Sequence, residues 1–208
     1  MKQFKIRASQ IGKIMGESKP KGQLSSTCIT YLKEWYSEQM YGEREDIRSK
    51  YFDKGNMCEN EAIDVISERL NLGIAFKNVN FFENDFITGT PDILTETMVI
   101  DAKCSWDGKT FLDSVTSDID KNYEWQLIGY MALTKRVEAK LCYVLLDTPE
   151  DANYGIEVIY SNIPIEKRFK SFNIDYSEEK IKAIEEKVLM CRNWLIEYDL
   201  KVKECLKF

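Results

Sequence analysis

Residues 86–103 constrain the fold of this 208-residue chain more than any other segment. A Gly-Thr-Pro sequence interrupts a first apolar stretch, and the chain re-enters an extended run at Asp92. Over Met98–Lys103, side chains then alternate with the two-residue period of a strand. The segment predicts adjoining strands, with Asp101 and Lys103 on one face and a second carboxylate nearby.

Helical and strand patterns alternate along the rest of the chain. Apolar residues recur with helical spacing at about 9–15, 25–41, 49–70, 121–134 and 177–205. Strand patterns cover about 75–82, 86–94, 98–103, 138–147 and 156–161. This order predicts an α/β (α+β mixed) fold, in which a central mixed β-sheet is flanked by helices. We expect a single domain with a basic helical region at about 1–45, a core at about 46–165 and a C-terminal helix at about 177–205.

The composition excludes several classes of site. The chain has no histidine, which rules out histidine general bases and histidine-bound zinc. Its six cysteines form no C-x-x-C pair, so we expect reduced thiols in a cytoplasmic protein and no zinc or iron–sulfur site. No apolar run approaches a membrane span, and Met1–Arg7 lacks the apolar stretch of a secretory signal. Any metal is therefore expected to be Mg²⁺ or Mn²⁺ held by oxygen ligands.

Charge is distributed unevenly along the chain. The net charge is −6, yet residues 1–33 carry seven basic side chains and one acidic side chain, Glu17. A basic end on an acidic body is typical of a phosphate-binding surface, and equally of a solvated lysine-rich end. On the first interpretation, the expected phosphate contacts are Lys2, Arg7, Ser9, Lys13, Lys19 and Lys21.

A helix upstream of the strands supplies a third carboxylate. One stripe of this predicted helix consists of Glu59, Ile63, Ile66 and Leu70. Glu59 therefore continues an apolar, core-facing line, and helical phase favours it over the nearby Glu61. A donor set of carboxylates and a backbone carbonyl suits one or two Mg²⁺ ions. The expected ligands are Glu59, Asp92, Asp101 and the carbonyl oxygen of Ala102.

The predicted helix at 121–134 adds two polar side chains to this set. Gln126 and Tyr130 lie one helical turn apart on one face. Both can hydrogen-bond a metal-bound water, a phosphate or an acidic ligand.

Each of these features also has a purely structural interpretation. Pro-Asp is common in turns, and the face of Asp101 and Lys103 fits the solvated side of an edge strand. Glu59 fits a helix-end glutamate that reaches water, Tyr130 fits an apolar core, and Gln126 fits the surface. The order of the motifs is more specific than any one of them.

In that order the motifs resemble those of the PD-(D/E)XK nucleases, and within them the group of phage lambda exonuclease and the YqaJ-type viral recombinases. The resemblance runs from about Arg7 to Asp147. The matching segments are Arg7-Ala8-Ser9-Gln10-Ile11-Gly12, Lys54–Ala62, Gly89-Thr90-Pro91-Asp92, Ile100-Asp101-Ala102-Lys103 and Glu124–Tyr130.

This resemblance implies a restriction-endonuclease-like core and a role for each site residue. Glu59, Asp92 and Asp101 correspond to metal ligands. Lys103 corresponds to the residue that positions or activates the attacking water, and Gln126 to one that supports the site. The implied activity is that of a Mg²⁺-dependent deoxyribonuclease, most specifically a 5′–3′ exonuclease on linear double-stranded DNA in phage-type recombination. The implied partners are DNA, a single-strand annealing protein and further copies of the chain in a homo-oligomer, for which a trimeric ring is one arrangement, within a bacterial host cytoplasm.

Two other functions fit the same residues. One is a structure-selective or nicking endonuclease on the same scaffold, which would also cleave a covalently closed circle. The other is a non-enzymatic DNA- or protein-binding module. Such a module has no need for three converging acids beside a lysine.

Overall fold

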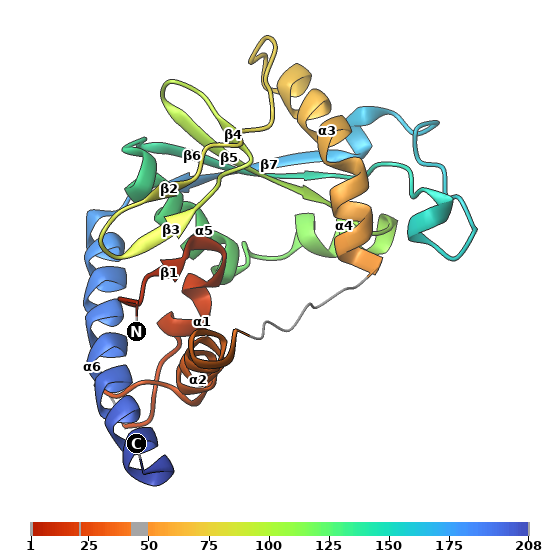
Figure 1. Cartoon of the computed structure of the whole chain (residues 1–208). Coiled ribbons are helices and arrows are strands. Elements are labelled where there is room, and N and C mark those ends of the chain that lie inside the picture. The colour runs from red at the N-terminus through yellow and green to blue at the C-terminus, as the bar shows by residue number, and fades with distance from the viewer. Residues whose placement is uncertain (1, 21, 43–49, 208) are drawn as a thin grey trace.

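Two mixed β-sheets form the centre of the structure, a computed structural model that describes residues 2–20, 22–42 and 50–207 (Figure 1). The smaller sheet has the order β1-β3-β2, with β1 at Ile6–Arg7, β2 at Phe82–Glu83 and β3 at Ile87–Gly89. The larger sheet has the order β4-β5-β6-β7, with β4 at Ile93–Leu94, β5 at Met98–Cys104, β6 at Glu138–Val144 and β7 at Phe169–Asp175. The predicted mixed α/β fold is confirmed. Lys21, one of the expected phosphate contacts, lies outside the described residues.

The centre of the larger sheet is a parallel pair of strands. β5 and β6 pair in register from Met98 opposite Glu138 to Cys104 opposite Val144. Parallel neighbours need a crossover connection, which α4 (Gly108–Thr116) and α5 (Lys121–Thr134) provide. β4 and β7 flank this pair in antiparallel orientation.

Helices cover the two faces of the larger sheet separately. On one face, Ile100 and Cys142 pack in a cluster with Ile63 and Ile66 of α3 (Lys50–Arg69). On the other face, the alternate residues of β5 and β6 pack in a cluster with α5 and the long helix α6 (Glu178–Leu206). The period of two along the strands sorts the side chains between these clusters.

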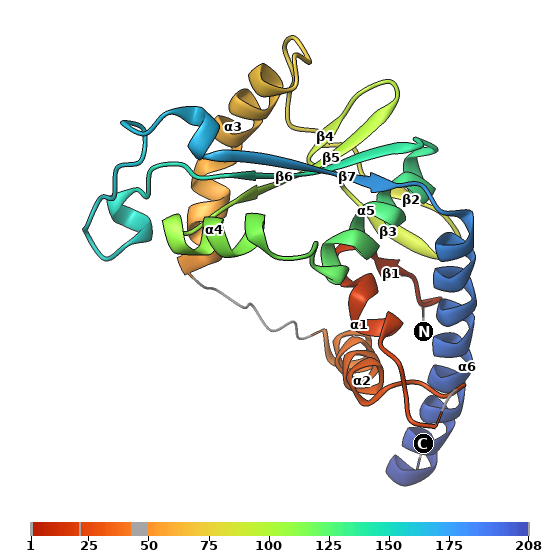
Figure 2. The same ribbon diagram turned by 180° about the vertical axis from the view of Figure 1, so that it is seen from behind.

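A helical lobe lies beside the smaller sheet. It contains η1 (Ala8–Gln10), α1 (Ile11–Met15), α2 (Ser26–Tyr41) and much of α6, which runs along one side of the molecule (Figure 2). The side chain of Ser25 caps α2 by accepting a hydrogen bond from the N–H of Cys28, and Gly42 ends α2 with a left-handed φ of 72°. None of the described helices combines the length and apolarity needed to cross a membrane.

Several predicted elements differ from those observed. The strand expected at 75–82 is wrong: only Phe82–Glu83 joins a sheet, and Phe76, Val79 and Phe81 are exposed. The strand expected at 156–161 is also wrong, because within it only Val158 forms a single bridge, to Thr148. Apolar β-prone residues gave both segments the local signature of strands without a neighbouring strand to pair with.

Other elements were split or missed by the sequence patterns. The run at 86–94 forms two short strands because Gly89-Thr90-Pro91 interrupts it. The patterns missed β7, which lies at the edge of its sheet, where few apolar side chains are needed. They also missed α4, which begins where the side chain of Asp107 accepts a hydrogen bond from Thr110 N. Two short turns of 3₁₀ helix complete the chain, η2 (Glu150–Ala152) and η3 (Ile165–Lys167).

Candidate active site

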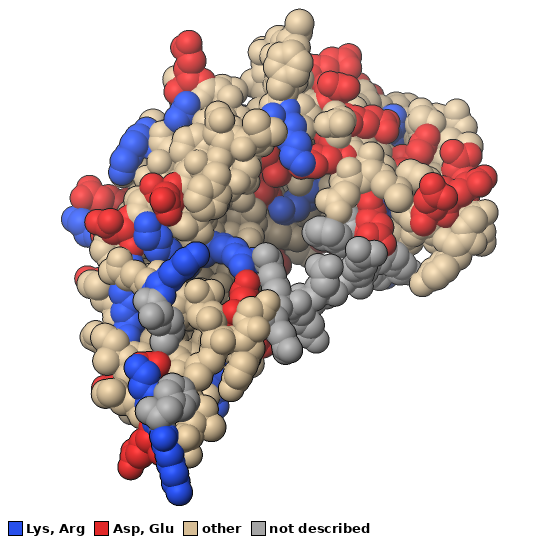
Figure 3. All heavy atoms as spheres, in the orientation of Figure 1, with Lys and Arg blue, Asp and Glu red and all other residues tan. Residues whose placement is uncertain are grey.

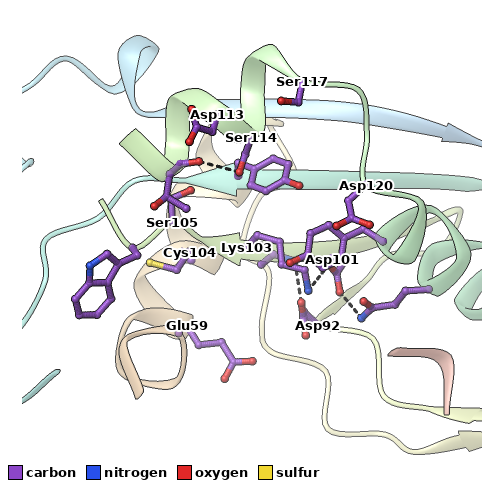
Figure 4. A pocket seen from close by; sticks show the side chains of 18 of the residues that line it. Glu59, Asp92, Asp101, Lys103, Cys104, Ser105, Asp113, Ser114, Ser117 and Asp120 are labelled. Carbon is purple, nitrogen blue, oxygen red and sulfur yellow. Dashed lines mark hydrogen bonds and ion pairs between the residues drawn. The ribbon is translucent and has the colours of Figure 1, made fainter. Parts of the chain in front are cut away.

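The predicted site residues meet in one cavity of about 960 Å³. Its walls come from α3, β5, α4, α5 and the chain just before β4. In the space-filling view, acidic and basic side chains lie side by side within the central hollow (Figure 3). The close-up shows Glu59 extending from α3 toward the space that Asp92, Asp101 and Lys103 border (Figure 4). The predicted residues that line the cavity are Glu59, Asp92, Asp101, Ala102, Lys103 and Gln126.

Asp101 is a buried carboxylate on a central strand. β5 lies between β4 and β6, and Asp101 is only 1% exposed, so its face is not the solvated side of an edge strand. The strand period puts Asp101 and Lys103 on the side of Val99, facing α5, as predicted. A buried carboxylate of this kind needs partners of opposite charge or hydrogen-bond donors.

Two side chains satisfy Asp101 in part. Nε2 of Gln126 donates a hydrogen bond to Oδ1 at 2.8 Å, and Nζ of Lys103 lies 2.7 Å from Oδ2. Beyond Lys103, no hydrogen-bond donor among the described residues reaches the buried Oδ2. An oxygen in this state retains acceptor capacity for a cation.

Tyr130 holds the side chain of Gln126 in place. Its Nε2 also lies 3.2 Å from the hydroxyl of Tyr130, which donates to the carbonyl of Thr90 at 3.2 Å. A Cβ on Gly89 would lie 2.8 Å from Cε1 of Tyr130, so the glycine of the Gly-Thr-Pro-Asp motif makes room for this ring. Both Gln126 and Tyr130 are buried. Tyr130, one of the expected DNA contacts, therefore lies behind the site, where it supports Gln126.

Asp92 is held on the segment beside β5, and burial and nearby negative charges destabilise its ionised form. Its Oδ2 accepts a hydrogen bond from the backbone N–H of Ala102 at 2.8 Å. Because the N–H of Ala102 points toward Asp92, its carbonyl points to the same side of β5. Burial, together with the negative charges of Asp101 and Glu59, raises the pKa of Asp92 to about 7.

Lys103 is a permanent cation in this setting. Burial acts to lower its pKa, but the carboxylates of Asp101 and Asp92 outweigh burial and hold the pKa above its ordinary value. Its ammonium also lies 4.7 Å from the centre of the Tyr123 ring. Lys103 is therefore suited to donating hydrogen bonds and not to removing a proton.

Glu59 lines the cavity and has a basic partner that the sequence patterns did not reveal. Nζ of Lys77 forms an ion pair with Oε2 of Glu59. Glu61, the alternative acid, is exposed and does not line the cavity. Lys77 lies in the run that the strand pattern misassigned, and nothing local marks it as a partner of α3.

The donor set fits a hard divalent ion by its chemistry. The three predicted carboxylate ligands and Ala102 line one cavity, and Oδ2 of Asp101 keeps spare acceptor capacity. Three further acids line the same cavity, Asp113, Asp118 and Asp120. Among the described residues, no three His, Cys, Asp or Glu side chains lie close enough together to hold a metal ion. Glu59 is instead paired with Lys77, and Asp101 with Lys103.

The expected phosphate contacts near the start of the chain lie apart from the cavity. Lys2, Ser9, Lys13 and Lys19 are exposed. Arg7 is partly exposed, and its guanidinium lies 3.5 Å from the carboxylate of Glu38. The space-filling view shows basic side chains gathered beside the hollow, over the region of β1 and α1 (Figure 3). Such a position suits the path of a bound polyanion.

Lys54 is a further residue that sequence reasoning did not single out. Its side chain is fully buried, and its ammonium donates to Trp106 O, Leu146 O and Thr148 Oγ1, each at 2.8 Å. These three bonds tie α3 to the chain that follows β5 and to the chain that follows β6. Lys54 therefore fixes the helix that carries Glu59.

Comparison with solved structures places this fold among exonucleases. A phage-related exonuclease from Haemophilus somnus 129PT is 29% identical and superposes with a TM-score of 0.83, covering 98% of this chain and 97% of that one. The alkaline exonuclease LHK-Exo from Laribacter hongkongensis is 19% identical with a TM-score of 0.74, covering 98% and 95% of the two chains. The same enzyme in complex with dAMP is 18% identical with a TM-score of 0.76, covering 98% of this chain and 93% of that one.

These likenesses extend over nearly the whole chain. At 18–19% identity, LHK-Exo shares the fold, while the Haemophilus protein is similar in sequence as well. No model of a protein family matches the chain, and a search of curated proteins found no match. The structural neighbours of this chain are therefore phage-related and alkaline exonucleases.

Proposed function

We propose that the chain is a Mg²⁺-dependent deoxyribonuclease, most specifically a 5′–3′ exonuclease that degrades linear double-stranded DNA. The observation that carries the proposal is the meeting of Glu59, Asp92, Asp101 and Lys103 in one cavity. The likeness to the phage-related exonuclease of Haemophilus somnus supports a nuclease activity. Mn²⁺ is the alternative ion, since it takes the same oxygen ligands.

Glu59, Asp92, Asp101 and the carbonyl of Ala102 are the residues that would hold the ion. When bound, a divalent ion supplies a hydroxide nucleophile at neutral pH and neutralises charge in the transition state. Lys103 keeps its proton and donates hydrogen bonds to the attacking oxygen or to the scissile phosphate, because its pKa is raised. Gln126 fixes the orientation of Asp101 through the bond to Oδ1.

The deciding experiment compares DNA ends with DNA that has none. A 5′-phosphorylated linear duplex and a covalently closed circle of the same sequence are digested with Mg²⁺ or with EDTA. The proteins are the wild type, Lys103→Ala and the control Lys182→Ala, which removes an exposed lysine of α6. We expect metal-dependent loss of the linear duplex alone, abolished by Lys103→Ala and retained by Lys182→Ala.

Polarity is tested with duplexes that carry nuclease-resistant linkages at one kind of end. Resistant 5′ ends should block digestion, and resistant 3′ ends should not. Cleavage of the closed circle would move the assignment to an endonuclease. Binding of DNA without cleavage of either substrate, at any concentration of Mg²⁺ or Mn²⁺, would favour the binding-module alternative.

The same proposal implies a homo-oligomer, with a trimeric ring as the expected form, and a single-strand annealing protein as partner. A ring around the duplex would hold the enzyme on its substrate between cuts. α6 presents Leu189, Ile196 and Leu200 as exposed apolar side chains, which makes the part of α6 from Leu189 onward the proposed contact between copies. Sedimentation of the wild type against Ile196→Lys tests this contact, since the charge should lower the assembled mass.

A further inference from the structure

An irregular segment, residues 74–81, places a lysine at the edge of the candidate active site. Lys77 pairs with Glu59, although 18 positions separate the two residues in the sequence. The side chain of Lys77 is 45% exposed and that of Glu59 is 24% exposed. The pair therefore lies at the solvent boundary of the cavity, where each partner has room to exchange the other for a ligand.

Asn78 anchors this segment to the residues around Asp92. Its backbone N–H donates to the carbonyl of Asp92 at 2.7 Å, and its Nδ2 donates to the carbonyl of Pro91 at 2.9 Å. The side-chain Oδ1 of Asn78 also accepts a hydrogen bond from the N–H of Asn80 at 3.2 Å. The backbone beside Lys77 is thus fixed to the segment that carries a predicted metal ligand, while the long side chain stays flexible.

The two ion pairs of the site differ in their exposure to solvent, and this difference suggests a role for Lys77. Three of the acids that line the cavity are the predicted metal ligands, Glu59, Asp92 and Asp101. In the described residues two ammonium groups pair with these three, Lys103 with Asp101 and Lys77 with Glu59. The side chain of Lys103 is 25% exposed and that of its partner Asp101 is 1% exposed. Lys77 is 45% exposed, on a segment whose neighbours Phe76 and Val79 are 78% and 81% exposed. Of these two pairs, only that of Lys77 and Glu59 has an acid that is in contact with solvent.

We propose that Lys77 is a DNA-phosphate contact that Glu59 retains until Glu59 is used as a metal ligand. The proposal rests on the proposed nuclease function. The ammonium of Lys77 neutralises the carboxylate of Glu59. Once the oxygens of Glu59 turn to a divalent ion, Lys77 faces the cavity opening without its acid, and a phosphate of bound DNA is the anion that takes its place.

The first test measures metal affinity in the absence of DNA. Titration calorimetry with Mn²⁺ compares the wild type, Lys77→Gln, Glu59→Gln and the double variant. Lys77→Gln should bind Mn²⁺ about two- to fivefold more tightly, because an exposed competing ion pair has been removed. In the Glu59→Gln background the same substitution should have no such effect, since its competition acts through Glu59. The control Lys182→Gln removes an exposed ion-paired lysine of α6 and should leave the affinity unchanged.

The second test measures DNA binding without cleavage. Fluorescence anisotropy of a labelled duplex in Ca²⁺, over a series of KCl concentrations, gives the salt slope of the binding constant. Lys77→Gln should weaken binding on unrelated sequences alike and reduce the slope by about 0.9, the value for one phosphate contact. Lys182→Gln should leave the slope unchanged.

The two tests separate this proposal from the one beneath it. Metal affinity that falls or stays constant in Lys77→Gln would overturn it, because Lys77 would then orient Glu59 instead of competing for it. An unchanged salt slope would overturn the phosphate contact. If the wild type binds no Mn²⁺ and leaves the linear duplex intact, the nuclease function fails and this proposal fails with it. If the wild type binds and cleaves while Lys77→Gln behaves like Lys182→Gln, this proposal alone fails.

Discussion

At the scale of single residues, the site is a set of charges that are not balanced by protein groups alone. Burial and the charges of Asp101 and Glu59 raise the pKa of Asp92 to about 7, so it retains a proton at a pH where a free aspartate is ionised. Gln126 and Ala102 supply neutral donors that fix the carboxylates without adding positive charge. Placing these carboxylates close together costs stability, which is typical of a functional site.

Asp92→Asn should stabilise the metal-free protein at high pH. The folded-state pKa of Asp92 is raised to about 7 from an ordinary value of 3.8, so the folded protein keeps a proton that the unfolded chain releases. Stability is therefore lost as the pH rises from about 4 to about 7, by up to about 4 kcal/mol. In EDTA, the Asp92→Asn substitution should raise the melting temperature at pH 8 and leave it unchanged at pH 4.

The control for this pH profile is Asp113→Asn, which alters an exposed carboxylate at the rim of the same cavity. Mg²⁺ should stabilise the wild type at pH 8 and have little effect on Asp92→Asn. Equal pH profiles for the wild type and Asp92→Asn would show that the pKa of Asp92 is not raised in the folded protein.

Gln126→Met should impair cleavage without impairing folding of the sheet. Methionine fills similar space but leaves Oδ1 of Asp101 without its amide donor. Loss of a group that orients a ligand typically costs about 10- to 100-fold in activity. Single-turnover digestion of linear duplex measures this effect, and Gln39→Met, on an exposed residue of α2, is the control. Cleavage at the wild-type rate would remove Gln126 from the site.

At the scale of elements, the position of α3 in the site depends on how this helix packs against the larger sheet. β5 is held by strands on both sides, whereas α3 reaches the larger sheet through an apolar stripe and the buried Lys54. The three acceptors of Lys54 match the three hydrogens of an ammonium group, so its charge is fully hydrogen-bonded. Burial nevertheless lowers the pKa of Lys54.

Lys54→Met should destabilise the docking of α3. The substitution keeps the length of the side chain but removes the donor to the buried carbonyl of Leu146 and to the part-buried carbonyl of Trp106. We expect a loss of about 2–4 kcal/mol in the free energy of unfolding by urea. Amide hydrogen exchange should accelerate most in α3. Lys182→Met, at an exposed position, should change stability by less than about 0.5 kcal/mol, and an equal effect of the two variants would contradict this role.

At the scale of the whole molecule, charge is separated between residues 1–33 and the rest of the chain. The net charge of −6 coexists with an excess of basic residues in 1–33. The structure brings several of these residues to the surface, with Lys13 close to the ring of Tyr31 at 5.3 Å. A long polyanion can follow such a surface while the acidic cavity receives one phosphodiester.

The double variant Lys13→Gln/Lys19→Gln should weaken binding of DNA in Ca²⁺ on unrelated sequences alike. If each lysine contacts one phosphate, the slope of log K against log[KCl] should fall by about 0.9 for each. Fluorescence anisotropy over a salt series measures it. A slope equal to that of Lys182→Gln would mean that the basic end is only solvated.

Local periodicity in the sequence was enough to predict which acids of α3 and β5 line the cavity. The strand period put Asp101 and Lys103 on one face, and helical phase selected Glu59 over Glu61, because both patterns depend on residues only a few positions apart. The same reasoning misassigned 75–82 and 156–161, where strand-like residues have no adjacent strand.

Only the tertiary structure decided which distant groups meet. The burial of Asp101 against Gln126, the three bonds of Lys54 and the ion pair of Lys77 with Glu59 each join segments that are far apart in the chain. Such pairs have no local signature, since they arise from how helices and sheets pack and not from the spacing of neighbours. The sequence by itself determined which acids face inward, and the packing decided which cations and amides they meet there.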